Sequence, residues 1–225
     1  IITFLLGLCS FFSFASHSIG GTVSWQNVGV GQFVFELKLI HKCYGSAVTP
    51  ISLRQLESPL GQIPVELKRA TGYTPTCESA SGIWCNSTST SNWVLTSMVY
   101  RSDTITITGT PPATGWKFYY RDNDRSSNTV NIQVAANVQT EVYGIMYPEA
   151  VTHNLSSPTF VDTYDESITP YNHLVSNMAF TSQNKDSLYY RLVPSITGSG
   201  TSYSYNSGFD YQNPFPTQAN NAANG

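Results

Sequence analysis

Apolar and charged residues alternate along residues 33–39, which gives the clearest hydrophobic pattern in the chain. Apolar side chains occupy every odd position from Phe33 to Leu39, and polar or charged residues stand at most of the even ones. Side chains two residues apart share one face of a strand, so this pattern predicts a strand with one buried face. Residues 22–25 show a similar pattern, and the glycines within residues 27–31 favour a turn. We therefore expect a β-hairpin near the start of the chain.

Many further short strand patterns follow, separated by segments rich in turn-forming residues, and no segment carries a sustained helical stripe. This combination is typical of antiparallel sheets packed as a sandwich, so the predicted fold class is all-β. The expected strands lie at residues 51–56, 63–67, 93–100, 104–108, 116–120, 129–134, 141–146, 159–161, 174–180, 188–193 and 203–205.

A change of composition after Tyr147 indicates a domain boundary. We predict two tandem antiparallel β-sandwich modules of the immunoglobulin or cadherin type: a first at 16–147, a linker at 148–156, and a second at 157–211. The second is expected to be incomplete, because its apolar runs are fewer and shorter, and residues 212–225 form a low-complexity tail. The predicted core of the first module includes Phe33, Phe35, Leu37, Trp116, Phe118 and Val130.

The first fourteen residues are uncharged and mostly apolar, and this run is too short to span a bilayer as a helix. Small residues at Ser13 and Ala15 form the pattern that signal peptidase accepts. We therefore expect residues 1–15 to be a signal peptide, with a buried strand or helix as the alternative.

The composition also indicates the class of protein and which partners to expect. Charged residues make up 11% of the chain, well below the usual share of about 25%, as in many extracellular β-proteins. A net charge of −3 offers no basic field for a nucleic-acid backbone, so nucleic acid is excluded as an expected partner.

Cleavage of the leader would remove Cys9 and leave Cys43, Cys77 and Cys85 in an oxidising compartment. Cys77 and Cys85 are close enough in sequence to close a short loop, so we predict a structural disulfide between them. Cys43 is then a buried thiol or pairs with a cysteine outside this chain, and a pairing with Cys77 or Cys85 is the alternative.

Several sequence blocks stand in a characteristic order along the chain. They are residues 17–25, 33–39 and 42–43, the cysteines Cys77 and Cys85, and residues 115–121, 156–160, 185–194, 205–209 and 213–216. In this order the blocks resemble the N-terminal region of large secreted, gliding-motility-associated, adhesin-like surface proteins of Bacteroidetes. Members of that family are multi-module proteins that the type IX system typically exports.

Two departures from the family pattern matter. The family has a Cys-Cys pair after its aromatic strand, where this chain has residues 122–125 without cysteine, which implies that Cys43 lacks its usual partner. The family also has an acidic loop, similar to the calcium loops of cadherin-like proteins, where this chain has residues 182–188. Two acidic residues of that loop are missing here, which argues against calcium at this position.

Catalytic motifs do not stand out. The sequence has no Gly-x-Ser-x-Gly elbow, no His-Glu-x-x-His, no paired Cys-x-x-Cys and no glycine-rich phosphate loop. We therefore expect no enzymatic activity and no cofactor. Calcium is the alternative, bound by residues 122–124 or by Asp162, Asp165 and Glu166 beside Asp186, although turn formation explains these residues equally well.

Aromatic residues give the remaining hint of function. Tyr203 and Tyr205 share a face by alternation and are candidate ligand-facing aromatics, with cross-strand packing as the alternative. We expect a non-catalytic cell-surface or secreted binding or structural module, associated with the outer membrane, whose partners are an extracellular protein or glycan and other modules of a longer chain. The alternatives are a carbohydrate-binding module and an accessory region of a downstream extracellular enzyme.

Overall fold

The computed structural model describes residues 17–43, 52–73, 94–122, 131–133, 139–160, 180–196 and 201–214. Strands dominate these residues, and the one helix among them, α1, has five residues. The elements are β1 (His17–Gly29), β2 (Gln32–Cys43), β3 (Leu53–Leu56), β4 (Ile63–Tyr73), β5 (Val94–Arg101), β6 (Ile105–Thr106), β7 (Trp116–Asp122), β8 (Thr140–Met146), α1 (Pro148–Thr152), β9 (Thr159–Phe160) and β10 (Phe180–Thr181).

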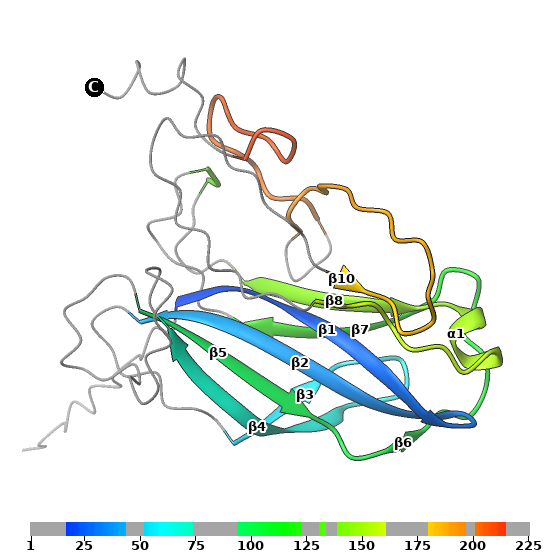
Figure 1. The fold of residues 1–225 in the computed structure, drawn as a ribbon. Coiled ribbons are helices and arrows are strands. Elements are labelled where there is room, and N and C mark those ends of the chain that lie inside the picture. The colour runs from blue at the N-terminus through cyan, green and yellow to red at the C-terminus, as the bar shows by residue number, and fades with distance from the viewer. Residues whose placement is uncertain are drawn as a thin grey trace, which may run out of the picture.

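The largest sheet has the strand order β1-β2-β5-β4-β3, and β6 pairs with one end of β2. Two further sheets have two strands each, β7–β8 and β9–β10, and all paired strands are antiparallel. Figure 1 shows β7 and β8 lying across the large sheet as a second layer. The predicted all-β class, with antiparallel sheets packed as a sandwich, is confirmed.

The predicted hairpin is present as β1 and β2, and it is longer than the sequence indicated. Trp25 pairs with Phe35, and the pairing continues to His17 and Lys42 at the far end. The two-residue turn contains Gly31, whose φ of 66° lies in the left-handed region that glycine tolerates. Residue propensity predicted only the middle of β1, residues 22–25. The rest of the strand contains glycine and serine, which have low strand propensity, and pairing with β2 keeps it in the sheet.

The core lies between the large sheet and β7–β8. Phe33, Phe35, Leu37 and Phe118 are all 0% exposed, as predicted. The ring centroids of Phe35 and Phe118 are 4.5 Å apart, which joins the two layers through one aromatic contact. Trp116 is half-buried and packs against this core, whereas the predicted core residue Val130 lies outside the described residues.

Strand β8 approaches β1 closely at Gly144. A Cβ atom at this position would lie 3.0 Å from Cζ3 of Trp25 and 3.0 Å from the carbonyl oxygen of Val23. The absence of a side chain therefore allows the second layer to contact the Trp25 ring and the β1 backbone directly.

Residues 154–157, here called the strap, run along the edge of β1. The Trp25 amide donates to Oγ of Ser157 at 2.8 Å, and the Ser157 amide donates to the Trp25 carbonyl at 2.9 Å. Oγ of Ser156 accepts from the Asn27 amide at 3.0 Å, and Oδ1 of Asn154 accepts from the Gly31 amide at 2.7 Å. The strap therefore satisfies the amides of Trp25 and Asn27 in β1, and of Gly31 in the turn, by side-chain oxygens instead of another strand.

Replacing Ser157 by alanine is expected to lower the free energy of unfolding by about 1–2 kcal/mol, because the buried Trp25 amide loses its acceptor. Urea denaturation followed by tryptophan fluorescence measures the change. Ser58→Ala is a matched control, since the Ser58 hydroxyl bonds only within an exposed turn. Equal stabilities of the two variants would contradict a role for the strap.

The C-terminal part contains less strand than predicted. Residues 188–193 form no strand: Tyr189 is 86% exposed and Leu192 53% exposed, so the predicted strand is wrong. Tyr205 makes only an isolated bridge, to Ile132, and Phe180 lies in β10. Helix α1, which begins at Pro148, was not predicted. The division into two modules stays a prediction.

Candidate functional site

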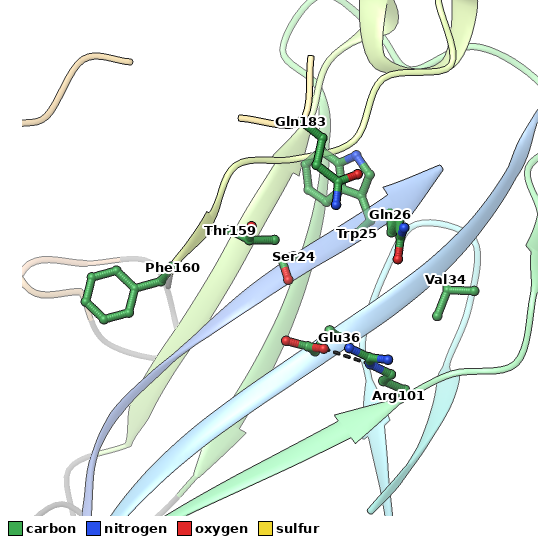
Figure 2. A pocket seen from close by; sticks show the side chains of 9 residues that line it. All are labelled: Ser24, Trp25, Gln26, Val34, Glu36, Arg101, Thr159, Phe160 and Gln183. Atoms are coloured by element: carbon green, nitrogen blue, oxygen red, sulfur yellow. Dashed lines mark hydrogen bonds and ion pairs between the residues drawn. The ribbon is translucent and has the colours of Figure 1, made fainter. Parts of the chain in front are cut away.

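A groove of about 300 Å³ lies on the outer face of the large sheet, opposite the core (Figure 2). Its floor is formed by side chains of β1, β2 and β5, and its far wall by residues beyond the strap. The lining residues are Ser24, Trp25, Gln26, Val34, Glu36, Arg101, Thr159, Phe160 and Gln183.

The alternation of side chains along β1 and β2 determines which residues form the floor of the groove. Phe35 and its odd-numbered neighbours face the core, so Val34 and Glu36 of β2 face outward into the groove. In the antiparallel register, Ser24 lies opposite Glu36, and Gln26 lies opposite Val34. The polar positions of the hairpin are therefore gathered into one surface by the same pattern that builds the core.

An ion pair crosses the floor. Glu36 and Arg101 are direct partners between β2 and β5, and the Nε of Arg101 donates to Oε2 of Glu36 at 2.8 Å. The Arg101 side chain is 56% exposed and that of Glu36 is 29% exposed, so solvent screening leaves the pair little value for stability. The ion pair instead fixes the carboxylate of Glu36 and the guanidinium of Arg101 at the surface, where the remaining oxygen and nitrogen atoms face the groove.

The far wall comes from β9 and from the turn after β10. Phe160 packs edge-on against Phe180, with ring centroids 4.8 Å apart, and Phe180 contacts Tyr190 at 5.7 Å. Asn184 anchors the turn, because its Nδ2 donates to the carbonyl of Ser156 at 2.8 Å. The wall that carries Thr159 and Gln183 is thus fixed to the strap, which is itself fixed to β1.

This arrangement suits reversible binding. Hydroxyl and amide side chains supply both donors and acceptors, and the charges of Glu36 and Arg101 oppose each other. Glu36 supplies a carboxylate among the described lining residues, and it is paired with Arg101.

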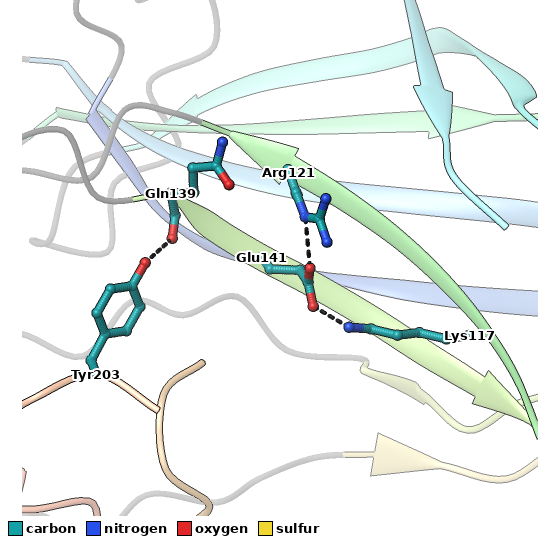
Figure 3. Close-up of polar contacts among 5 residues, drawn as sticks. All are labelled: Lys117, Arg121, Gln139, Glu141 and Tyr203. Atoms are coloured by element: carbon teal, nitrogen blue, oxygen red, sulfur yellow. Dashed lines mark hydrogen bonds and ion pairs between the residues drawn. The ribbon is translucent and has the colours of Figure 1, made fainter. Parts of the chain in front are cut away.

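The predicted ligand-facing tyrosines lie elsewhere. The hydroxyl of Tyr203 donates to the Gln139 carbonyl at 2.6 Å (Figure 3), and that of Tyr205 accepts from the Ser195 amide at 3.0 Å. Both side chains are half-buried and use their hydroxyl groups within the protein. Their contact with a ligand stays a prediction. Cys77 and Cys85 lie outside the described residues.

The outer face of β7–β8 carries a second polar cluster, also drawn in Figure 3. Lys117 and Arg121 both donate to Glu141, and the Arg121 Nε lies 2.9 Å from Oε2 of that carboxylate. The Glu141 side chain is 0% exposed, and the guanidinium of Arg121 lies 4.6 Å from the Tyr119 ring centroid. The cluster is an internally satisfied ion-pair network.

The candidate calcium ligands are partly described. The Asp186 carboxylate accepts from the Ser182 hydroxyl at 3.1 Å, which makes it part of the turn. Asp122 is 8% exposed and lies 3.9 Å from the buried His41 imidazole, on the inner side of the sandwich. The described ranges contain no group of three or more metal-ligating side chains. Asp162, Asp165 and Glu166 lie outside those ranges.

Hydrogen bonds lower the pKa of one exposed carboxylate near the C-terminal end of the described residues. The side chain of Asn213 donates to Asp210, and the backbone amides of Asn213 and Gln212 add further bonds, so the pKa of Asp210 is lowered. These bonds close the turn that follows the Tyr203–Tyr205 region.

No family model matches the chain, and neither the curated proteins nor the solved structures contain a match to it. In the part of the chain that the structure describes, no helix is long and apolar enough to cross a membrane.

Proposed function

We propose that this chain is a non-catalytic extracellular module that binds a ligand in the groove between β1–β2–β5 and the wall at Thr159 and Gln183. The observation that carries this proposal is the groove itself. It gathers hydrogen-bonding side chains from segments more than a hundred residues apart onto one outward-facing surface.

Export and a place at the cell surface are parts of the same proposal. They are supported by the apolar leader, the low content of charged residues, and the resemblance to the opening of large adhesin-like surface proteins of gliding Bacteroidetes. In such a protein a rigid sandwich would present the groove to a partner, and further modules of the same chain would connect it to the cell.

The test is a binding screen of the immobilised chain against extracellular proteins and glycans. The wild type is compared with the double variant Gln26→Ala/Gln183→Ala, which removes one amide from the β1 floor and one from the wall after β10. We expect a retained ligand whose binding the double variant weakens about tenfold or more, because each lost hydrogen bond costs part of the affinity.

Gln55→Ala is the matched control. Gln55 is exposed on β3, at the opposite end of the strand order from β1, so its loss should leave binding unchanged. A ligand that binds the double variant as well as it binds the wild type would place the site away from the groove and overturn the proposal.

A further inference from the structure

We infer that the groove takes an uncharged saccharide, an inference that rests on the proposed binding function of the same site. The class of ligand follows from four features of the groove: its balance of charge, its hydrogen-bonding groups, its apolar side chains and the state of the neighbouring sheet edge.

The charge balance disfavours a strongly ionic ligand. Among the lining residues that the structure describes, the ionised side chains are those of Glu36 and Arg101, and they are paired at 2.8 Å. An acidic ligand would have to compete with Glu36 for the guanidinium, and a basic ligand would have to compete with Arg101 for the carboxylate. Lys38 lies outside the lining residues, with its Nζ 5.7 Å from the Phe160 ring centroid.

The hydrogen-bonding groups match sugar hydroxyls. Each hydroxyl of a sugar donates one hydrogen bond and accepts others, so a complementary surface needs donors and acceptors side by side. Gln26 and Gln183 each supply both in one planar amide. The Thr159 hydroxyl, which lies 3.4 Å from the hydroxyl of Thr181, retains capacity to accept a hydrogen bond from a ligand. The remaining guanidinium nitrogens of Arg101 add donors, and the second oxygen of Glu36 adds an acceptor.

Apolar atoms complete the match. Val34 lies on the floor and Phe160 at one end of the groove (Figure 2), where they offer surface to the C–H face of a sugar ring. A volume of about 300 Å³ lies at the lower end of the range for small-molecule pockets. The groove therefore suits a short segment of a saccharide rather than a large folded ligand.

The neighbouring sheet edge disfavours a peptide. An extended peptide that adds to a sheet needs free backbone amides along an edge strand. In β1 the amides of Trp25 and Asn27 already donate to Ser157 and Ser156 of the strap. The backbone amides of β1 closest to the groove are therefore already bonded. Binding of a polar ligand by the side chains of the groove is favoured over addition of a peptide strand.

The experiment uses the full chain on a panel of neutral oligosaccharides (cello-, manno- and xylo-), acidic oligosaccharides (alginate and pectate) and immobilised extracellular proteins. We expect retention of a neutral oligosaccharide, with binding weakened about tenfold or more in Gln26→Ala/Gln183→Ala and unchanged in Gln55→Ala. Circular dichroism of every variant establishes that the fold is retained.

A second variant, Glu36→Gln, tests the charge argument. It preserves the shape of the side chain but leaves Arg101 without its counter-charge, so retention of alginate or pectate should increase relative to the wild type. A wild type that binds only acidic saccharides, or only proteins, through the groove would overturn the inference of an uncharged saccharide while the proposed binding function stands. Absence of any groove-dependent ligand would overturn both.

Discussion

Phe35→Ala is expected to lower the free energy of unfolding by about 3–5 kcal/mol, the usual cost of removing a buried phenylalanine ring. Phe35 is 0% exposed, and its ring contacts Phe118 at 4.5 Å and Trp25 at 6.5 Å between centroids. The substitution therefore leaves a cavity at the contact between the two layers and removes aromatic contacts on both sides.

Urea denaturation of the full chain, followed by tryptophan fluorescence, measures this loss. Val30→Ala is the control, because Val30 lies in the β1–β2 turn and is 89% exposed, so it should change stability by less than about 0.5 kcal/mol. Similar stabilities for the Phe35 and Val30 variants would contradict the placement of the core.

Gly144→Val should lower the free energy of unfolding by about 3 kcal/mol, near the upper end of the usual cost of overpacking. One atom that would meet the new Cβ is the Val23 carbonyl oxygen, and backbone cannot rotate away as a flexible side chain can. The expected result is displacement of β8 from β1, seen as a lower thermal midpoint and a change in tryptophan fluorescence.

Gly20→Val gives the matched control for this substitution. Gly20 also lies in a strand, but a Cβ at this position meets no atom within 4 Å. Because valine itself favours strands, the control should retain or raise stability. A Gly144 variant as stable as the Gly20 variant would show that β1 and β8 are not in close contact.

Much of the fold was predictable because one pattern decides it. The alternation that begins at Phe33 assigns β2 and its buried face, and turn residues at Gly29 and Gly31 assign the hairpin. Helix α1 was not predicted, since five residues beginning at Pro148 have too few positions to show a helical period. Residues 188–193 look like a strand by composition, but side-chain type alone cannot supply the partner that a strand needs.

The groove was not predictable to the same extent. The polar face of the hairpin, with Ser24, Gln26 and Glu36, is visible in the alternation, yet nothing in the sequence places Arg101 or Gln183 beside it. The pairing of β2 with β5 brings Arg101 beside Glu36, and the bond of Asn184 to the strap brings the turn with Gln183 to the groove. The prediction that Tyr203 and Tyr205 face a ligand stays a prediction, and composition does not reveal that their hydroxyl groups bond within the protein.

The strap also bears on how such modules behave when many copies are crowded together. A strand with free amides along its outer side is a template for pairing with the same strand of another molecule, which leads to aggregation. Ser157 and Ser156 occupy the amides of Trp25 and Asn27 in the second half of β1 with side-chain oxygens, which cannot extend the sheet. At high protein concentration these two amides are therefore not available for pairing with β1 of another molecule.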